Sequence, residues 1–444
     1  MSSYSKPHTE SFYKTIKDFI PKIDNNFKQV CEAEITIQEL DKALSCLSKD
    51  KAPGCDGLTS NFYKFFWDHI KDLIFQMLKE VLENGSLTHT MKQGVITLIP
   101  KPGKDPNRLD NLRPITLLNN DYKLLTHIFA NRLKLGITQI ISETQSGFIK
   151  GRSIHNNIRL VLDLIDYDFL INNEGFILLL DFYKAFDMIE HSFMFQALQS
   201  FGFGSKFINV IQTFYNDTSS SVCLPHGTSQ RFQINKGIKQ GCPISPLLFI
   251  AAAEMLSILI KNADFGKLLI ADTELSICQL ADDTTIFLNN LNEIPKILQF
   301  IECFSKASGL RLNLNKCEIL PLKPCAVSSV CNIPVKSTVK YLGMQITKDK
   351  NDLEKLNIWD KLQTCTTSLN NWAQRDLSIF GRILLTKMES ISRLIYPAYS
   401  IGIPKPAIKS INQINFNFIW KRKTHYIKQG NLIKKYEDGG LQSD

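Results

Sequence analysis

The sequence has 444 residues, enough for roughly two to four domains, and its 44% hydrophobic and 21% charged content is typical of a folded chain. The net charge of +9 favours an anionic partner only weakly, and the polar N-terminus lacks the apolar core of a signal peptide. Eleven scattered cysteines without C-x-x-C spacing argue against structural zinc and for reduced thiols in the nucleus or cytoplasm.

Sequence patterns predict helices at both ends of the chain and strands between them. In chain order the predicted elements are a helix at 36–49, a loop at 51–57, a strand at 94–100, a helix at 121–137, a buried strand at 175–182, two short strands around a tight turn at 276–288, and a strand at 340–347. From about 352 the pattern is helical again, with a helix at 377–397 that ends at Pro397. We therefore expect an α/β (α+β) fold with a central sheet flanked by two mostly helical regions.

Charge and hydropathy along the chain suit a nucleic-acid partner better than a membrane. The regions 91–104 and 420–435 are rich in basic residues and contain no acidic residue, a distribution that suits a long polyanion. Solvated helix faces are the alternative for either region alone. The most apolar stretch, 246–260, is shorter than the roughly 20 residues that span a bilayer and contains Glu254, so no membrane segment is predicted.

Two acidic sites stand out because each lies beside an apolar strand. Asp181 follows the run 176–180, and the pair Asp282–Asp283 lies at the predicted turn. If the strands are neighbours in one sheet, three carboxylates meet at one edge and repel each other strongly without a cation. Oxygen ligands select Mg²⁺ or Mn²⁺, and two such ions about 4 Å apart form a clamp for displacement at phosphorus. Taken singly, such a pair is usually turn chemistry and an aspartate like Asp181 is more commonly a helix cap, so the combination carries the metal interpretation.

A loop rich in glycine and proline, 237–249, lies between these acids in the sequence. Its composition predicts a rigid backbone that other groups can approach closely. Gln240 stands at the open part of this loop, where its amide could contact a sugar or a base. The alternative interpretation is a plain helix N-terminus with Ser245 as its cap.

These segments, in this order, resemble the reverse transcriptase domain of non-LTR (long interspersed element) retrotransposons. The motifs that carry the resemblance are KAPGCDG (51–57), LIPK (98–101), LRPI (112–115), ETQSGFIKGRSIHNNI (143–158), DFYKAFD (181–187), KQGCPISPLLF (239–249), LADD (280–283), FSKASGLRLNLNKCE (304–318), YLGMQI (341–346), LNNWAQRDLSIFGRILLTK (369–387) and EDGGL (437–441). So many ordered matches over nearly the whole chain make the resemblance specific.

The resemblance implies a right-hand polymerase fold. Its parts would be an N-terminal helical extension (1–50), fingers (51–174), a palm with an antiparallel sheet and helices (175–348, including finger and palm helices at 192–235), and a helical thumb (349–444). The implied activity is RNA-directed DNA polymerisation by two-metal phosphoryl transfer, with two Mg²⁺ ions, or Mn²⁺ in their place. The implied partners are an RNA template, a DNA primer, their RNA–DNA hybrid and dNTPs.

The resemblance also implies roles for individual residues. The catalytic residues would be Asp181, Asp282, Asp283 and Lys316, with Lys316 protonating the leaving pyrophosphate, and the metal ligands would be Asp181, Phe182, Asp282 and Asp283. The dNTP contacts would be Lys101, Arg113, Gln240 and Phe186, the last as a steric gate against a 2′-hydroxyl. The template and primer contacts would be Gly147, Arg152, Gly241, Tyr341, Leu342, Gly343, Arg375 and Arg382. Surface cations and a core phenylalanine are the alternatives for Lys101, Arg113 and Phe186.

The sequence departs from the family pattern at two positions and at both ends. Leu280 stands where Tyr or Phe is usual, and Lys239 stands where Arg is common. No N-terminal endonuclease and no C-terminal zinc knuckle are recognised, so we expect a polyprotein fragment or truncated copy that polymerises DNA without nicking it. The competing hypothesis is a non-catalytic nucleic-acid-binding remnant. An intron-encoded maturase would carry a splicing domain after the thumb.

Overall fold

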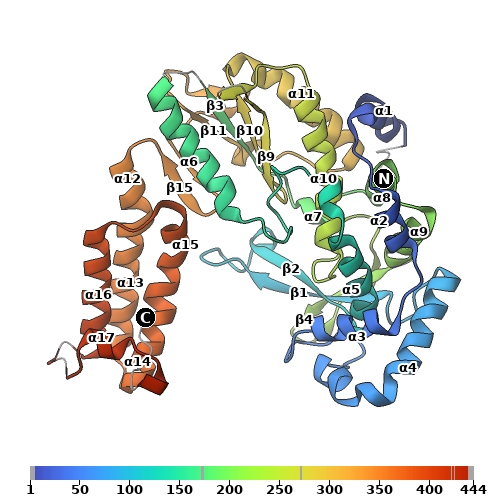
Figure 1. Ribbon diagram of the computed structural model, residues 1–444, viewed down its shortest axis with the longest axis horizontal. Coiled ribbons are helices and arrows are strands. Elements are labelled where there is room, and N and C mark those ends of the chain that lie inside the picture. Colours follow the sequence, from blue (N-terminus) through green and yellow to red (C-terminus); the bar gives the residue numbers. More distant parts are fainter. Residues whose placement is uncertain (1–5, 172–174, 271–272, 422, 425, 439–444) are drawn as a thin grey trace. The chain divides into compact units, whose positions relative to one another are not determined.

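The computed structural model describes residues 6–171, 175–270, 273–421, 423–424 and 426–438 (Figure 1). The chain separates into two compact units. The first unit takes Met1–Arg152, Leu178–Cys317 and Cys331–Ile333, and the second takes Ser153–Ile177, Glu318–Val330 and Pro334–Asp444. Both units combine helices and strands, so the predicted mixed fold is confirmed.

The helices of the first unit include one central, mostly apolar helix, α10 (Ser245–Asn262). They are α1 (Lys6–Ile16), α2 (Asn25–Glu32), α3 (Ile37–Cys46), α4 (Ser60–Asn84), α5 (Asn120–Lys134), α7 (Ala185–Met188), α8 (His191–Ser200), α9 (Ser205–Tyr215), α10 (Ser245–Asn262) and α11 (Ile294–Ser308). Helix α10 is long and apolar enough to cross a bilayer, but 83% of it is buried inside the fold, where α5, α8, α11 and β9 contact it. Its composition is therefore that of a core helix.

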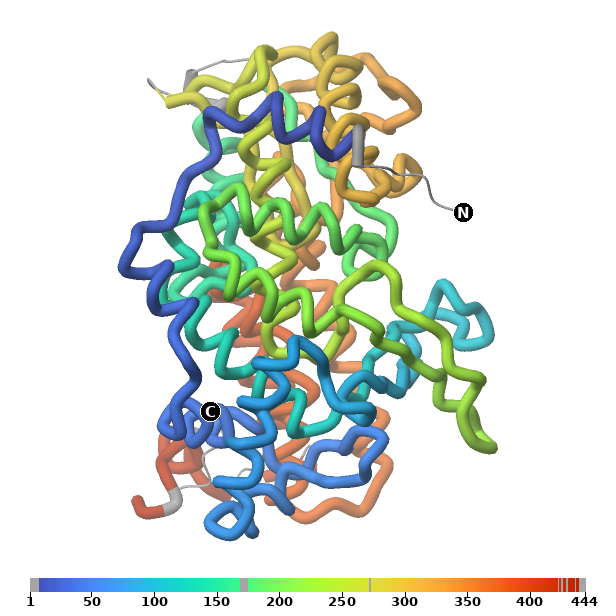
Figure 2. Tube along the Cα trace, turned by 90° about the vertical axis from the view of Figure 1, so that its right-hand side faces the viewer, coloured from blue at the N-terminus to red at the C-terminus, as the bar shows by residue number. Residues whose placement is uncertain are grey.

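The N-terminal helices pack into the first unit. Helix α1 lies along α11 (Figure 2), where Phe12 is fully buried and its ring centroid is 5.8 Å from that of Phe304. The Thr9 hydroxyl donates to the Ala307 carbonyl at 3.3 Å. The segment 1–50, predicted as an extension, thus contributes large buried side chains to the core.

Two sheets position the site. In the first, the strand order is β2 (Leu112–Leu117), β1 (Gln93–Pro100), β4 (Ser219–Leu224) and β5 (Gly227–Thr228), and β6 (Phe232–Gln233) also pairs with β4. In the second, β3 (Phe176–Leu180) neighbours β10 (Asp283–Leu288), which forms an antiparallel hairpin with β9 (Ile277–Leu280). Residues Ile177–Leu180 are buried, as their continuous apolar run predicts. The predicted tight turn between two short strands is confirmed.

The second unit is mostly helical. Its elements are α6 (Ile154–Ile171), β11 (Glu318–Pro321), β14 (Thr338–Tyr341), β15 (Met344–Thr347), α12 (Lys350–Glu354), α13 (Asp360–Ala373), α14 (Ile379–Thr386), α15 (Ser392–Ile401), α16 (Lys405–Ile419) and α17 (Gln429–Leu432). One turn of π-helix, Lys355–Trp359, joins α12 to α13, and another, Lys387–Ile391, joins α14 to α15.

Two local predictions and one alternative interpretation are wrong. The segment 340–347 is a hairpin and not one strand, because Leu342 and Gly343 both adopt positive φ (46° and 85°), as a two-residue hairpin turn requires. The helix predicted to end at Pro397 continues to Ile401, because Pro397 is buried where α15 packs on α6 and α13. Ser245 does not cap α10; it is the first helical residue, and its hydroxyl lies 3.1 Å from the Tyr215 hydroxyl.

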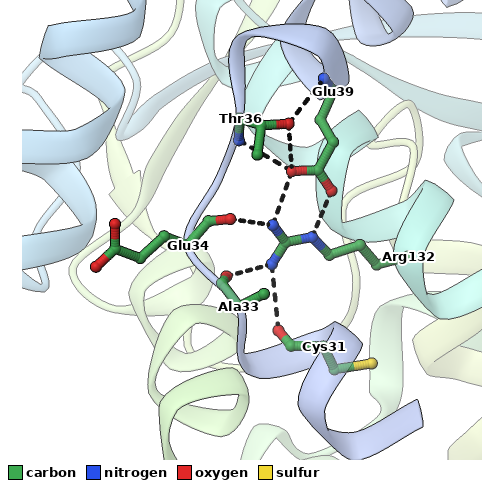
Figure 3. A network of polar contacts seen from close by, with 6 residues as sticks. All are labelled: Cys31, Ala33, Glu34, Thr36, Glu39 and Arg132. Carbon is green, nitrogen blue, oxygen red and sulfur yellow. Dashed lines mark hydrogen bonds and ion pairs between the residues drawn. The ribbon is translucent and has the colours of Figure 1, made fainter. Parts of the chain in front are cut away.

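A buried arginine in α5 ties the α2–α3 connection to the core (Figure 3). The Arg132 side chain is 4% exposed, and its Nε and Nη2 donate to the two carboxylate oxygens of Glu39 at 2.6 and 2.8 Å. Its other bonds go to the main-chain carbonyls of Cys31, Ala33 and Glu34 at 3.4, 2.6 and 2.8 Å. Burial alone would raise the pKa of Glu39, but the Arg132 hydrogen bond and charge hold that pKa below its ordinary value.

Arg132→Met is therefore expected to destabilise the chain by about 3–5 kcal/mol, since it leaves a partly buried carboxylate and three carbonyls without their donor. Urea denaturation measures the loss. The control Lys296→Met removes an exposed ion pair with Asp264 and is expected to change stability by less than about 1 kcal/mol. Equal effects of the two variants would contradict the structural importance of the Arg132 network.

Candidate active site

The three predicted carboxylates lie at one edge of the second sheet. Asp181 directly follows β3, Asp282 lies in the β9–β10 turn, and Asp283 opens β10 opposite Leu280. Partial burial and the carboxylates of Asp282 and Asp181 raise the pKa of Asp283 to about 6. Partial burial and Asp181 also raise the pKa of Asp282. These directions indicate mutual repulsion, so the structure brings together the groups that the sequence predicted.

A segment near residue 313 holds Asp181. The Asn313 amide Nδ2 and the Lys316 ammonium both donate to Asp181 Oδ2, at 3.1 and 3.2 Å, and the Asn313 N–H donates to the Asp181 carbonyl at 2.8 Å. The predicted role of Lys316 as a proton donor stays a prediction, but its ammonium lies at the carboxylate edge. The sequence did not predict a role for Asn313. Its one sequence signal is that this polar residue stands between two leucines, three positions before Lys316.

The donor set at this edge fits a hard divalent cation. Asp181, Asp282 and Asp283 supply only oxygen atoms, and their mutual repulsion is what a cation would relieve. Within the part of the chain that the structure describes, no three acidic, His or Cys side chains are clustered closely enough to hold a metal ion. In the structure, Asp181 Oδ2 accepts hydrogen bonds from Asn313 and Lys316. The Phe182 side chain is buried and offers no oxygen, so a metal role for this residue would rest on its main-chain carbonyl.

The predicted gate residue lies within an aromatic group. Phe186, in α7, stacks on the fully buried Phe249 with centroids 4.4 Å apart and planes 15° apart. The Phe148 ring lies edge-on to the Phe186 ring, with centroids 6.4 Å apart and planes at 87° to each other. Phe148 is 50% exposed and adopts φ 59°, which is rare for a residue with a side chain. The ring of Phe186 is therefore held in a defined orientation at the surface of the core.

The loop at 237–241 is tied to this group and to β2. The Ile238 N–H donates to the Phe186 carbonyl at 2.7 Å, and the Gln240 amide donates to Asp187 Oδ1 at 3.1 Å. The Thr116 N–H donates to the Gln240 carbonyl at 2.8 Å. Gly241 has φ 120°, and a Cβ there would lie 2.6 Å from the Thr116 carbonyl oxygen, so this contact requires glycine.

The two predicted finger cations lie on the β1–β2 hairpin. Arg113, in β2, pairs with Ile99 of β1, and its side chain is exposed with no hydrogen bond or ion pair among the described residues. Lys101 follows β1 directly, and its ammonium donates to the Asp110 carbonyl at 2.8 Å. Both cations therefore lie on one hairpin, but only Arg113 has an uncommitted charged group.

Two predicted nucleic-acid contacts are used by the fold. The Arg152 guanidinium donates to the carbonyls of Ser142, Gln145 and Ile141 at 2.6, 2.6 and 3.3 Å. The Arg382 guanidinium donates to Leu377 O twice, at 3.1 and 2.6 Å, and to Ile419 O at 2.7 Å. Each guanidinium makes three hydrogen bonds to main-chain carbonyls, which leaves few N–H groups that could bind a phosphate. Arg375 is exposed.

The predicted primer grip is the β14–β15 turn of the second unit. The Tyr396 hydroxyl, in α15, donates to the carbonyl of Leu342, whose φ is positive. The Tyr396 ring in turn lies 5.1 Å from His155, whose Nδ1 is 2.9 Å from the Ser400 hydroxyl. A helix thus supports the turn Tyr341–Gly343, a contact that the sequence did not reveal. In the predicted basic tail, Arg422 and His425 lie outside the described residues, as do residues 439–441 of the EDGGL motif.

The strand-end carboxylates of Asp181, Asp282 and Asp283, the ordered ring of Phe186 and the amide of Gln240 form one candidate site in the first unit. A family profile for reverse transcriptase (RNA-dependent DNA polymerase) matches residues 99–346, more than half of the chain. This chain belongs to the reverse transcriptase family. Members of this family have the right-hand polymerase fold, so the predicted fold class is confirmed. Members of this family also use divalent metal ions.

Curated relatives of this chain come from transposons and retrotransposable elements. The chain is 28% identical over 432 residues to the transposon TX1 uncharacterized 149 kDa protein of Xenopus laevis, covering 95% of this chain and 33% of that protein. It is 25% identical over 341 residues to the Pol polyprotein of the type-2 retrotransposable element R2DM of Drosophila melanogaster, covering 73% and 31%. The chain spans about a third of the length of these relatives. Their names confirm the predicted similarity to non-LTR retrotransposon proteins.

Among solved structures, telomerase from Candida albicans is similar to this chain. The similarity has a TM-score of 0.44 at 11% identity, and covers 83% of this chain and 68% of that chain.

Proposed function

We propose that this chain catalyses RNA-directed DNA synthesis, adding dNTPs to the 3′-hydroxyl of a primer on an RNA template. The observation that carries the proposal is the convergence of Asp181 with the Asp282–Asp283 turn at one sheet edge, in a chain whose residues 99–346 match the family. Partners in this reaction would be an RNA template, a DNA primer, their hybrid and dNTPs.

We infer that Asp181, Asp282 and Asp283 hold two Mg²⁺ ions, with Mn²⁺ able to replace them. When bound, such ions would supply the positive charge that activates the primer hydroxyl and stabilises the leaving pyrophosphate. The oxygen-only donor set and the raised pKa of Asp283 support this assignment. Lys316, whose ammonium lies 3.2 Å from Asp181 Oδ2, would give a proton to the leaving group.

Other side chains of the chain would bind and select the nucleotide. Arg113, exposed and uncommitted on β2, would grip the triphosphate with its guanidinium fork, and Lys101 would add a point charge. The Phe186 ring, fixed by Phe249, would exclude a 2′-hydroxyl. Gln240, with its amide oriented by Asp187, would contact the sugar or the base.

Glycines, a turn and an exposed arginine would contact the template and the primer. In the first unit these contacts would be Gly147 and Gly241, whose close main-chain neighbours in the fold are Ala281 and Thr116. In the second unit the turn Tyr341–Gly343 and the exposed Arg375 would contact the primer strand and the phosphates of the hybrid. Phosphate contacts of this kind give affinity that weakens as salt rises.

The test is a primer-extension assay with the purified chain on a primed RNA template. We expect dNTP incorporation in Mg²⁺, no incorporation in the presence of a chelator, and strong discrimination against rNTPs. Fluorescence anisotropy with the same labelled hybrid measures binding separately. A folded chain that binds the hybrid but extends nothing would contradict the proposal and leave a non-catalytic binding remnant.

A further inference from the structure

The backbone of the carboxylate turn is held in an unusual conformation. Ala281, which directly precedes Asp282, has φ 57°, in the left-handed region that residues with a Cβ rarely adopt. A non-glycine residue stays in that region only when its surroundings hold it there. The question is therefore which contacts fix Ala281.

A single buried side chain makes the principal contact. Gln145 is fully buried, and its Oε1 accepts the Ala281 N–H at 2.9 Å and the Gly147 N–H at 2.8 Å. Because both donors are main-chain N–H groups, the atom facing them must be the amide oxygen. The other amide atom, Nε2, has no hydrogen-bond partner among the described residues. An unpaired buried donor is unfavourable. The favourable hydrogen bonds of the Gln145 side chain are therefore the two that its amide oxygen accepts.

The main chain around Gln145 is anchored on β9. The Ser146 N–H donates to the Gln279 carbonyl at 2.9 Å, and the Gln279 N–H donates to the Thr144 carbonyl at 2.8 Å, so residues 144–146 run parallel to the strand that enters the turn. Arg152 secures the base of the same segment through the Ser142 and Gln145 carbonyls. The Gln145 side chain is thus presented from a fixed backbone.

Two further contacts fit the turn against this segment. A Cβ on Gly147 would lie 2.6 Å from the Ala281 nitrogen, so only glycine permits the observed approach. On the other side, the Gln279 amide donates to the Thr284 hydroxyl at 3.2 Å, and that hydroxyl donates to the Asp282 carbonyl at 3.3 Å. The backbone of Asp282 is therefore fixed on both sides, with Gln145 as the contact to Ala281.

We propose that Gln145 is a positioning residue for catalysis, which holds the Ala281–Asp282 backbone so that the Asp282 carboxylate is ready for the reaction. The inference rests on the proposed polymerase function for its catalytic consequence, but the hydrogen bond itself can be tested without activity. A small displacement of a catalytic group can lower a rate about 100-fold, so the effect on turnover should exceed the effect on binding.

The test compares Gln145→Leu with a matched control, Gln139→Leu. Gln139 also exchanges two hydrogen bonds with another segment, at Asp24, but it is exposed and these bonds do not involve the turn. In Gln145→Leu we expect kcat for dNTP incorporation to fall about 10- to 100-fold, with the Kd for the hybrid and the KM for dNTP changed less than about threefold. Gln139→Leu should leave all three unchanged.

Hydrogen exchange of the segment 277–288 supplies a readout independent of catalysis. The Ala281 amide should exchange faster in Gln145→Leu than in the wild type or the control. Unchanged exchange, or a fall in kcat matched by the same loss of hybrid binding, would overturn the proposal. An inactive wild-type chain would overturn the proposed function alone, because the exchange measurement still tests the contact.

If Gln145→Leu does not fold, Gly147→Ala tests the same contact from the other side. Its added Cβ would press on the Ala281 nitrogen, so the expected results are again lower kcat and faster exchange at residue 281. Full activity of a folded Gly147→Ala variant would overturn the proposal.

Discussion

Replacing Asp282 by asparagine is expected to reduce dNTP incorporation by at least about 10³-fold while leaving the affinity for the RNA–DNA hybrid unchanged. Asparagine has nearly the same volume but no negative charge. The variant would therefore keep the turn and lose the charge with which Asp282 is proposed to bind a divalent cation. Single-turnover extension of a primed RNA template measures the loss, and fluorescence anisotropy measures hybrid binding.

The same substitution should not weaken the fold. The pKa of Asp282 is raised in the folded chain, so its ionised form opposes folding in the absence of divalent ions. That unfavourable contribution is absent below the ordinary pKa of 3.8 and grows as the pH rises above it. At neutral pH, Asp282→Asn is therefore expected to be at least as stable as the wild type, as measured by thermal denaturation in chelator.

The matched control is Asp264→Asn. Asp264 is exposed, and its ion pair among the described residues is with the exposed Lys296, so this variant should keep activity within about twofold. If Asp282→Asn retained wild-type incorporation, the carboxylate at 282 would not be part of the catalytic machinery. If it lost activity together with stability, the loss would reflect unfolding.

Replacing Phe186 by alanine is expected to raise the incorporation of rNTPs relative to dNTPs by about 100-fold. The structure fixes this ring between the buried face of Phe249 and the edge of Phe148, so its position does not depend on the nucleotide. Alanine would leave space where the 2′-hydroxyl of a ribonucleotide is excluded. The change should appear mainly as a higher kcat/KM for rNTPs, with a smaller loss for dNTPs.

The measurement is the ratio of kcat/KM for each dNTP and its matching rNTP on one primed RNA template. Phe66→Ala is the control, because Phe66 is a partly exposed phenylalanine in α4 with no predicted role at the site, and it should leave the ratio unchanged. An unchanged ratio in Phe186→Ala would assign this ring to the core and not to sugar selection.

Features of the site that depend on local sequence were predictable. The apolar run before Asp181 predicts a buried strand, and the doubled aspartate between two short apolar runs predicts a hairpin turn, because periodicity and turn chemistry act over a few residues. The order of the motifs along the chain then identified the family, which the match over residues 99–346 confirms.

Partners distant in sequence were not predictable from one sequence. Asn313 lies 132 positions from Asp181, and Gln145 lies 136 positions from Ala281, so no local pattern links them. The two arginines Arg152 and Arg382 illustrate the same limit. From sequence each is a cation available to phosphate, but in the fold each donates to main-chain carbonyls.

The sequence by itself therefore determined most of the helices and strands, the acidic residues at the strand ends and the family. Only the tertiary structure decided which side chains meet at those ends, which cations are left uncommitted, and that Pro397 lies within a helix. The physical reason is that these two kinds of interaction act over different distances along the chain. Propensity and turn chemistry are set by neighbours along the chain, whereas burial and hydrogen-bond satisfaction are set by whatever segment the fold brings alongside.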